Sequence, residues 1–147
     1  MIKTNDSNGE ELTPKEIQRS VDYLNLTYNN IDKEILRILY KDYGETTKFI
    51  LKTGGKLKKN VLIGEKNRIL TSQILFEINF LHLNSPVEFL LKRHNYSIFL
   101  RQNAFSESLK ILSVFAEELG YNKEKYQLEL YKLLAFKYLF TKYSLDF

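Results

Sequence analysis

The chain has 147 residues, no cysteine, a net charge of +4 and 44% hydrophobic residues. This length suits one domain, and the missing cysteines exclude disulfide frameworks and thiolate chemistry. The polar N-terminus gives no targeting peptide, and Gln73, Glu77 and Asn79 interrupt the longest apolar stretch, so no membrane span is expected. We expect a cytoplasmic protein with a flexible segment over residues 1–12 and a single helical domain over 13–147.

Two proline positions predict where helices begin. Thr13 can cap a helix in which Pro14 takes the first position and Glu16 reaches back to the cap amide. Residues 85–88, Ser-Pro-Val-Glu, repeat the arrangement. Proline lacks the N–H that a helix start leaves unpaired, so both sites favour a helical start.

The spacing of apolar residues predicts most of the other helices in chain order. Helices are expected from about 14 (Ile17, Val21 and Leu24 buried), from about 31 (Ile31, Ile35, Ile38 and Leu39 on one stripe), over 67–83, from 86, from about 106 (Leu109, Leu112, Phe115, Ala116 and Leu119), and over 123–142. Gly120 is expected as a left-handed stop. These elements predict an all-α fold, a compact helical bundle of about six or seven helices.

Residues 45–63 leave two interpretations open because they contain adjacent glycines, Gly54 and Gly55. A two-residue turn there would make a short basic hairpin near residues 48–63, but its register would place apolar residues opposite polar ones. A helix over about 45–53, with Gly54 as its left-handed cap, is favoured. Its inward residues would be Thr46, Phe49, Ile50 and Thr53. A phosphate-binding loop is disfavoured because Leu57 stands where that motif needs Ser or Thr.

The positive charge is concentrated between residues 48 and 68. This segment contains seven basic residues and one acidic residue, Glu65, so its net charge is +6. Lysine suits phosphate contacts and not the bidentate reading of bases, so we expect nonspecific nucleic acid, an acidic protein partner or a solvated loop. The candidate residues are Lys48, Lys52, Lys56, Lys58, Lys59, Lys66 and Arg68.

No pattern of reactive side chains predicts catalysis. His82 ends the most apolar segment and is expected at the core or its boundary, while the basic neighbours of His94 suit a helix C-terminus. No histidine and carboxylate spacing supplies the ligands of a zinc site. We therefore expect no catalytic residue, no metal and no cofactor.

The last helix is apolar almost all round. Its polar stripe is Lys125, Glu129 and Lys132, and Phe136 continues that stripe where a solitary domain would prefer a charge. Such a helix is buried on more than one side, either inside its own bundle or against a second chain. Tyrosine favours interfaces, and the expected contact residues are Tyr131, Phe136 and Tyr138.

The favoured function is therefore that of a small non-enzymatic helical protein that acts by association, as an accessory subunit, adaptor or inhibitor. Its partner would be another protein or a second copy, bound through the C-terminal helix. The alternative is a nucleic-acid-binding regulatory protein that uses residues 48–68, with the early helices as a three-helix DNA module. An enzyme whose site assembles only in three dimensions is the third possibility.

Overall fold

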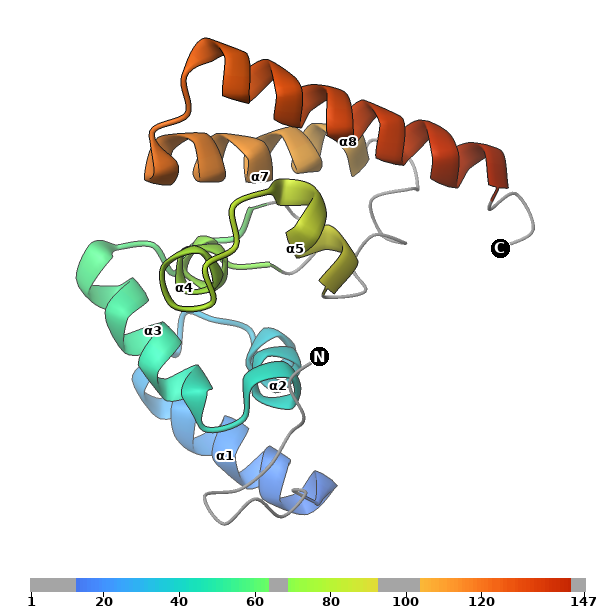
Figure 1. The fold of residues 1–147 in the computed structure, drawn as a ribbon. Coiled ribbons are helices and arrows are strands. Elements are labelled where there is room, and N and C mark those ends of the chain that lie inside the picture. The colour runs from blue at the N-terminus through green and yellow to red at the C-terminus, as the bar shows by residue number, and fades with distance from the viewer. Residues whose placement is uncertain (1–12, 64–68, 93–103, 144–147) are drawn as a thin grey trace. The chain divides into compact units, whose positions relative to one another are not determined.

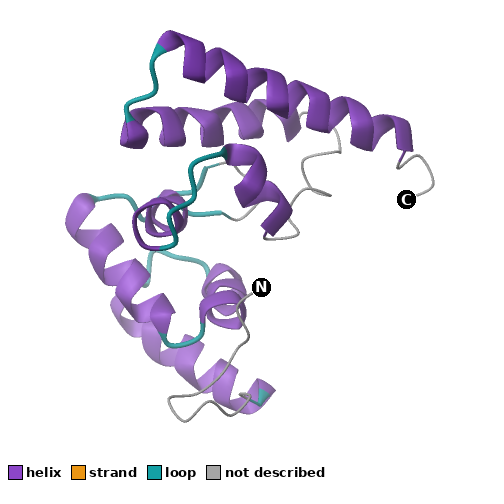
Figure 2. Ribbon diagram, viewed as in Figure 1, coloured by secondary structure: helices purple, strands orange, loops and turns teal. Residues whose placement is uncertain are grey.

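The computed structural model describes residues 13–63, 69–92 and 104–143. In these ranges the chain forms seven α-helices, and Figure 2 draws no strand there. The all-α prediction is confirmed. Contacts divide the chain into two compact units, Met1–Asn60 and Val61–Phe147. The single domain expected over 13–147 stays a prediction, and residues 1–12 lie outside the described ranges.

The first unit consists of three helices: α1 (Pro14–Thr27), α2 (Lys33–Tyr43) and α3 (Thr46–Leu57) (Figure 1). Helix α2 packs against both of the others. The predicted stripe of α1 is buried, and α2 buries most of its own stripe, whereas Ile38 is partly exposed. The buried apolar residues of this unit are Ile17, Val21, Leu24, Ile31, Ile35, Leu36, Leu39, Tyr40, Tyr43, Ile50 and Leu51.

The predicted start of α1 is confirmed, with one difference in the capping contacts. The Thr13 hydroxyl accepts a hydrogen bond from the Glu16 backbone N–H (3.2 Å), and Pro14 takes the first helical position. The Glu16 carboxylate accepts a hydrogen bond from the Thr13 hydroxyl (3.1 Å) and not, as expected, from the backbone N–H of the cap. The hydroxyl thus satisfies one of the N–H groups that the helix start leaves unpaired.

The hairpin near residues 48–63 is wrong, because Thr46–Leu57 is helical and contains both glycines. The favoured helix is longer than expected and turned about its axis, since it buries Thr47, Ile50, Leu51 and Gly54 and exposes Thr46 and Phe49. The left-handed residue at its end is Lys58 (φ 58°), not Gly54. Lys59 N–H bonds to Gly54 C=O (2.7 Å) and Lys58 N–H to Gly55 C=O (3.2 Å). This pair of bonds satisfies carbonyls of the last turn, which is why the helix stops there.

The second unit holds the other four helices and one short antiparallel pairing. The helices are α4 (Thr71–Phe80), α5 (Pro86–Lys92), α7 (Ala104–Leu119) and α8 (Lys123–Tyr143). Leu62 pairs with Leu70, with hydrogen bonds Ile63 N–H to Ile69 C=O and Thr71 N–H to Val61 C=O, both 2.8 Å. Sequence reasoning missed this pairing, which replaces the first turn expected for a helix over 67–83.

Helix α7 lies at the centre of the second unit. It packs against α4, α5 and α8, and α5 also packs against α8. The chain turns from α7 into α8 through Gly120, whose φ of +63° confirms the predicted left-handed stop. The buried apolar residues are Ile63, Ile69, Ile74, Ile78, Leu83, Phe89, Leu90, Ile111, Leu112, Phe115 and Leu133. The core of this unit therefore comes from all four helices, and among the described side chains of α8 the fully buried apolar one is Leu133.

Candidate functional site

The basic segment runs along the exposed side of α3. Lys48, Lys52 and Lys56 follow one another at intervals of four residues, and all three are exposed. Residues four apart lie on one helix face, so these side chains form a stripe. Lys58 and Lys59 extend it past the helix end and are also exposed. Lys66 and Arg68 lie outside the described residues.

Lys48 belongs to a local network of hydrogen bonds and charges. Its ammonium lies 2.7 Å from the Glu45 carboxylate, and the Tyr40 hydroxyl donates to the same carboxylate. The hydrogen bond from Lys48, followed by that from Tyr40, lowers the pKa of Glu45 below its usual value. Burial, followed by the hydrogen bond to Glu45, raises the pKa of Tyr40 to about 12. Lys48 therefore has a carboxylate that partly neutralises it, which distinguishes it from the rest of the stripe.

Glu129, the middle residue of the polar stripe of α8, faces inward, the reverse of what its charge suggests. The Glu129 side chain is fully covered, and its carboxylate lies 3.6 Å from Lys125 Nζ and 3.2 Å from Lys132 Nζ. Both lysines are partly exposed, so their ammonium groups cover the carboxylate from the solvent side. Burial, followed by the charges of Glu129 and Glu88, raises the pKa of Tyr121 to about 12. The Tyr121 hydroxyl donates to the Asn84 carbonyl.

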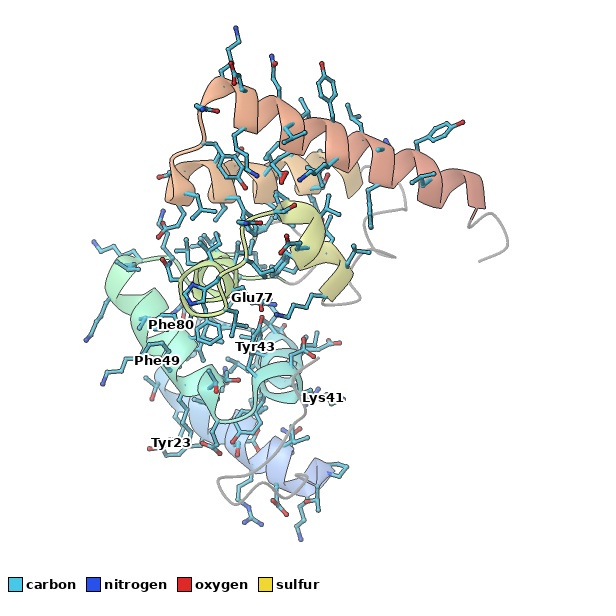
Figure 3. All side chains as sticks on the ribbon, in the orientation of Figure 1. Tyr23, Lys41, Tyr43, Phe49, Glu77 and Phe80 are labelled. Atoms are coloured by element: carbon cyan, nitrogen blue, oxygen red, sulfur yellow. The ribbon has the colours of Figure 1, made fainter. Side chains whose placement is uncertain are left out.

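The outward face of α8 carries large apolar side chains. We define the α8 outer face as Leu128, Tyr131, Leu134, Ala135, Tyr138 and Leu139. Tyr131 is 65% exposed and Tyr138 63%, and the three leucines are between 43% and 50% exposed. In Figure 3 a row of side chains projects from α8 on the side away from α7. No other described element of the second unit covers these residues, since each is exposed.

The three predicted contact residues of α8 lie on different sides of the helix. Tyr131 and Tyr138 are on the α8 outer face. Phe136 is half-buried and packs against the core of the second unit. Its position in line with Glu129 is as expected, but that line faces the protein interior, so the reason for expecting an exposed Phe136 does not hold.

The two histidines are the residues considered for chemistry in the sequence. His82 is exposed, contrary to the core position considered for it, and has a left-handed backbone (φ 58°) just after α4. His94 lies outside the described residues. Within residues 13–63, 69–92 and 104–143 no group of three or more His, Asp or Glu could hold a metal ion.

Sequence reasoning missed the buried Glu129 and the leucines of the outer face. The available signal was the spacing of Leu128, Tyr131, Ala135 and Tyr138, which alternates between three and four residues and is typical of a contact seam between helices. The charged stripe indicated a solvated side of the helix instead, because charged side chains are normally exposed.

Comparison with family models, with curated proteins and with solved structures found no match. Among the helices of the described residues, none has the length and apolar character needed to cross a membrane.

Proposed function

We propose that the protein acts by association with another protein chain and that the α8 outer face is the contact surface. One observation supports this most directly: five large apolar side chains lie exposed along one face of a helix whose opposite face is already packed. Contiguous apolar patches of this kind mark interaction sites. The side chains at the surface are tyrosines and leucines, which suit recognition by contact and supply no reactive group.

The partner that fits this face best is a second copy of the chain. Leu128, Tyr131, Ala135 and Tyr138 follow the 3–4 spacing of the positions at which two helices interlock. Leu133, which points into the core of its own unit, lies on the opposite side of the helix. The seam is therefore directed away from the core that holds α8 in place.

An antiparallel arrangement matches large side chains with small ones. If two copies of α8 pair in opposite directions about a twofold axis, Tyr131 meets the partner's Ala135 and Leu128 meets the partner's Tyr138. Each contact occurs twice by symmetry. A parallel pair would instead place each tyrosine against its own copy and leave Ala135 facing another alanine, which would leave a gap in the seam.

The available area suits a weak dimer. The five large exposed side chains offer roughly 600 Å² of surface on each chain, judged from the usual area of tyrosine and similar apolar residues. Two such faces bury roughly 1,200 Å², which is the lower end for specific interfaces. We therefore expect a dimer that dissociates on dilution.

The oligomeric state as a function of concentration tests the proposal. Light scattering coupled to size exclusion is expected to show a dimer for the parent protein at high concentration and a monomer for Tyr131→Glu/Tyr138→Glu. Tyr23→Glu is the matched control, because Tyr23 is similarly exposed (67%) but lies on α1. Circular dichroism checks that all variants remain helical. A parent that is monomeric at every concentration, or a double variant that still dimerises, would overturn the proposal.

Disulfide formation tests the direction of pairing, because the chain has no natural cysteine to interfere. In the antiparallel arrangement a mixture of Tyr131→Cys and Ala135→Cys is expected to form a cross-linked dimer, whereas neither variant should cross-link alone. Cross-linking of each variant with itself would indicate a parallel pair and overturn the antiparallel register.

A further inference from the structure

The first unit separates its charges by helix. Residues 46–60 contain five lysines and no acidic residue, whereas residues 13–45 contain five basic residues and six acidic ones. Several charged or polar groups of α1 and α2 are paired: Lys33 Nζ lies 3.2 Å from the Asp22 carboxylate, and Arg37 donates to Gln18 at 2.7 Å. The net excess of positive charge in the residues 13–60 is thus carried by α3 and the residues that follow it.

The connection between α2 and α3 has the form of a helix-turn-helix. Only Gly44 and Glu45 separate the two helices, and Gly44 takes a backbone conformation (φ 57°, ψ −136°) that side-chain-bearing residues rarely adopt. Figure 1 shows α2 nearly along its axis and α3 from the side, so the two helices cross steeply. The Thr47 hydroxyl donates to the Leu39 carbonyl (3.1 Å) in the buried contact between them. In DNA-binding proteins of this form the second helix enters the major groove.

The lysines of α3 point away from the packed side. The buried residues Thr47, Ile50, Leu51 and Gly54 define the inner side of the helix. At 100° per residue Lys52 and Lys56 lie on the opposite side, and Lys48 lies at its edge. Within the described residues no carboxylate pairs with Lys52, Lys56, Lys58 or Lys59.

From these observations we infer that α3 and the two lysines after it bind the phosphate backbone of double-stranded DNA. This inference is independent of the proposed pairing through α8. Lysine carries a point charge on a flexible stem and suits phosphate, whereas base reading favours arginine, asparagine or glutamine, none of which occurs between residues 46 and 59. Binding is therefore insensitive to base sequence and strongly dependent on salt.

The test is the salt dependence of binding to a short labelled duplex of about 20 base pairs, long enough to cover a protein of this kind. Each lysine that contacts phosphate contributes about 0.9 to the slope of log K against log salt. The parent is expected to show a slope near −4 per chain, from about four contacts. Lys52→Gln/Lys56→Gln is expected to reduce that slope by about 2, with a 10- to 100-fold loss of affinity at low salt.

Two further variants keep the test decisive. Lys110→Gln/Lys123→Gln removes the same net charge from exposed positions of the second unit and should leave the slope unchanged. Lys58→Gly removes one proposed contact while relieving a left-handed lysine, so it should lower the slope by about 1 in a protein that is no less stable. If every variant lost affinity equally, attraction to net charge alone would explain the binding and the inference would be wrong.

Other ligands define the remaining outcomes. No binding of the parent to the duplex at low salt would end the inference. Tighter binding of a single strand of the same length would overturn the duplex geometry. Binding of poly-glutamate in preference to DNA would indicate an acidic protein partner instead.

Discussion

Gly55 lies inside α3, and no neighbouring side chain requires a glycine at this position. A methyl group built there meets Asn60 Nδ2 at 3.7 Å, an ordinary contact distance. Glycine inside a helix costs about 0.5–1 kcal/mol relative to alanine, because the unfolded chain loses more freedom on folding. Gly55→Ala is therefore expected to raise the free energy of unfolding by about that amount, as measured by urea denaturation.

Gly120→Ala is the matched control for that substitution. Space is open around Gly120 as well, but its φ of +63° strains any residue with a side chain. Alanine there should lower stability by about 1 kcal/mol. If the two substitutions had the same sign, backbone conformation would not be what separates these glycines.

Tyr40 links stability to alkaline pH. Its pKa is raised to about 12 by burial and by the hydrogen bond to Glu45, whereas a tyrosine in the unfolded chain titrates near ~10. The folded state therefore holds the proton more tightly, so the stabilisation is complete below pH ~10 and is lost as pH rises towards 12. In that window each tyrosine of this kind contributes a decline of at most about 1.4 kcal/mol per pH unit.

Tyr121 has a similarly raised pKa and contributes to the same decline.

Tyr40→Phe is expected to be less stable at neutral pH, because Glu45 loses a hydrogen-bond donor. It is also expected to lose stability more slowly between pH 10 and 12. Urea denaturation at several pH values between 10 and 12 measures the free energy of unfolding of both proteins. If that free energy fell equally steeply with pH in the parent and in Tyr40→Phe, Tyr40 would not be the source of the decline.

At the scale of helix α8, the buried Glu129 and its two lysines are not equivalent. Glu129 is fully covered, while Lys125 and Lys132 reach solvent. Lys125→Met/Lys132→Met would leave a buried carboxylate without its partners, which typically costs about 3–5 kcal/mol. Glu129→Met leaves two lysines that can turn to water, so we expect a change of less than about 1 kcal/mol. Equal losses in the two variants would mean that packing and not charge is decisive.

Phe136 and Tyr131 provide a comparison of the two sides of α8. Phe136 packs against the core, so Phe136→Asp places a charge at that boundary and should destabilise the second unit by about 2–4 kcal/mol. Tyr131 is exposed, so Tyr131→Asp should leave the melting temperature of the monomer nearly unchanged. A folded and stable Phe136→Asp monomer would show that Phe136 belongs to the interface after all.

At the scale of the whole molecule, the two proposed surfaces belong to different units, since α3 lies in Met1–Asn60 and α8 in Val61–Phe147. If both basic helices of a dimer contact one duplex, the salt slope counts the phosphate contacts of both chains. The monomeric Tyr131→Glu/Tyr138→Glu variant is therefore expected to show about half the salt slope of the parent dimer. The salt dependence of binding to the same labelled duplex measures this. An unchanged slope would mean that the two surfaces act separately.

Much of the local structure followed from the sequence. The cap at Thr13, the helix start at Pro86 and the stop at Gly120 depend on interactions within a few residues, so short motifs predict them. The buried stripe of α1 followed from its apolar spacing, because a single stripe leaves one possible orientation. The location of the basic charge is likewise a property of the chain alone.

Only the tertiary structure decided which sides of α3 and α8 face inward. Both helices have apolar residues in several directions, so their own sequence permits more than one orientation. Thr47 is buried in the contact with α2, where its hydroxyl donates to the Leu39 carbonyl. Packing against α5 and α7 turned Glu129 inward, which is tolerated because Lys125 and Lys132 lie beside it. Burial depends on the neighbouring helices as well as on the helix itself, and that dependence is why the outer face of α8 could be recognised only in the folded chain.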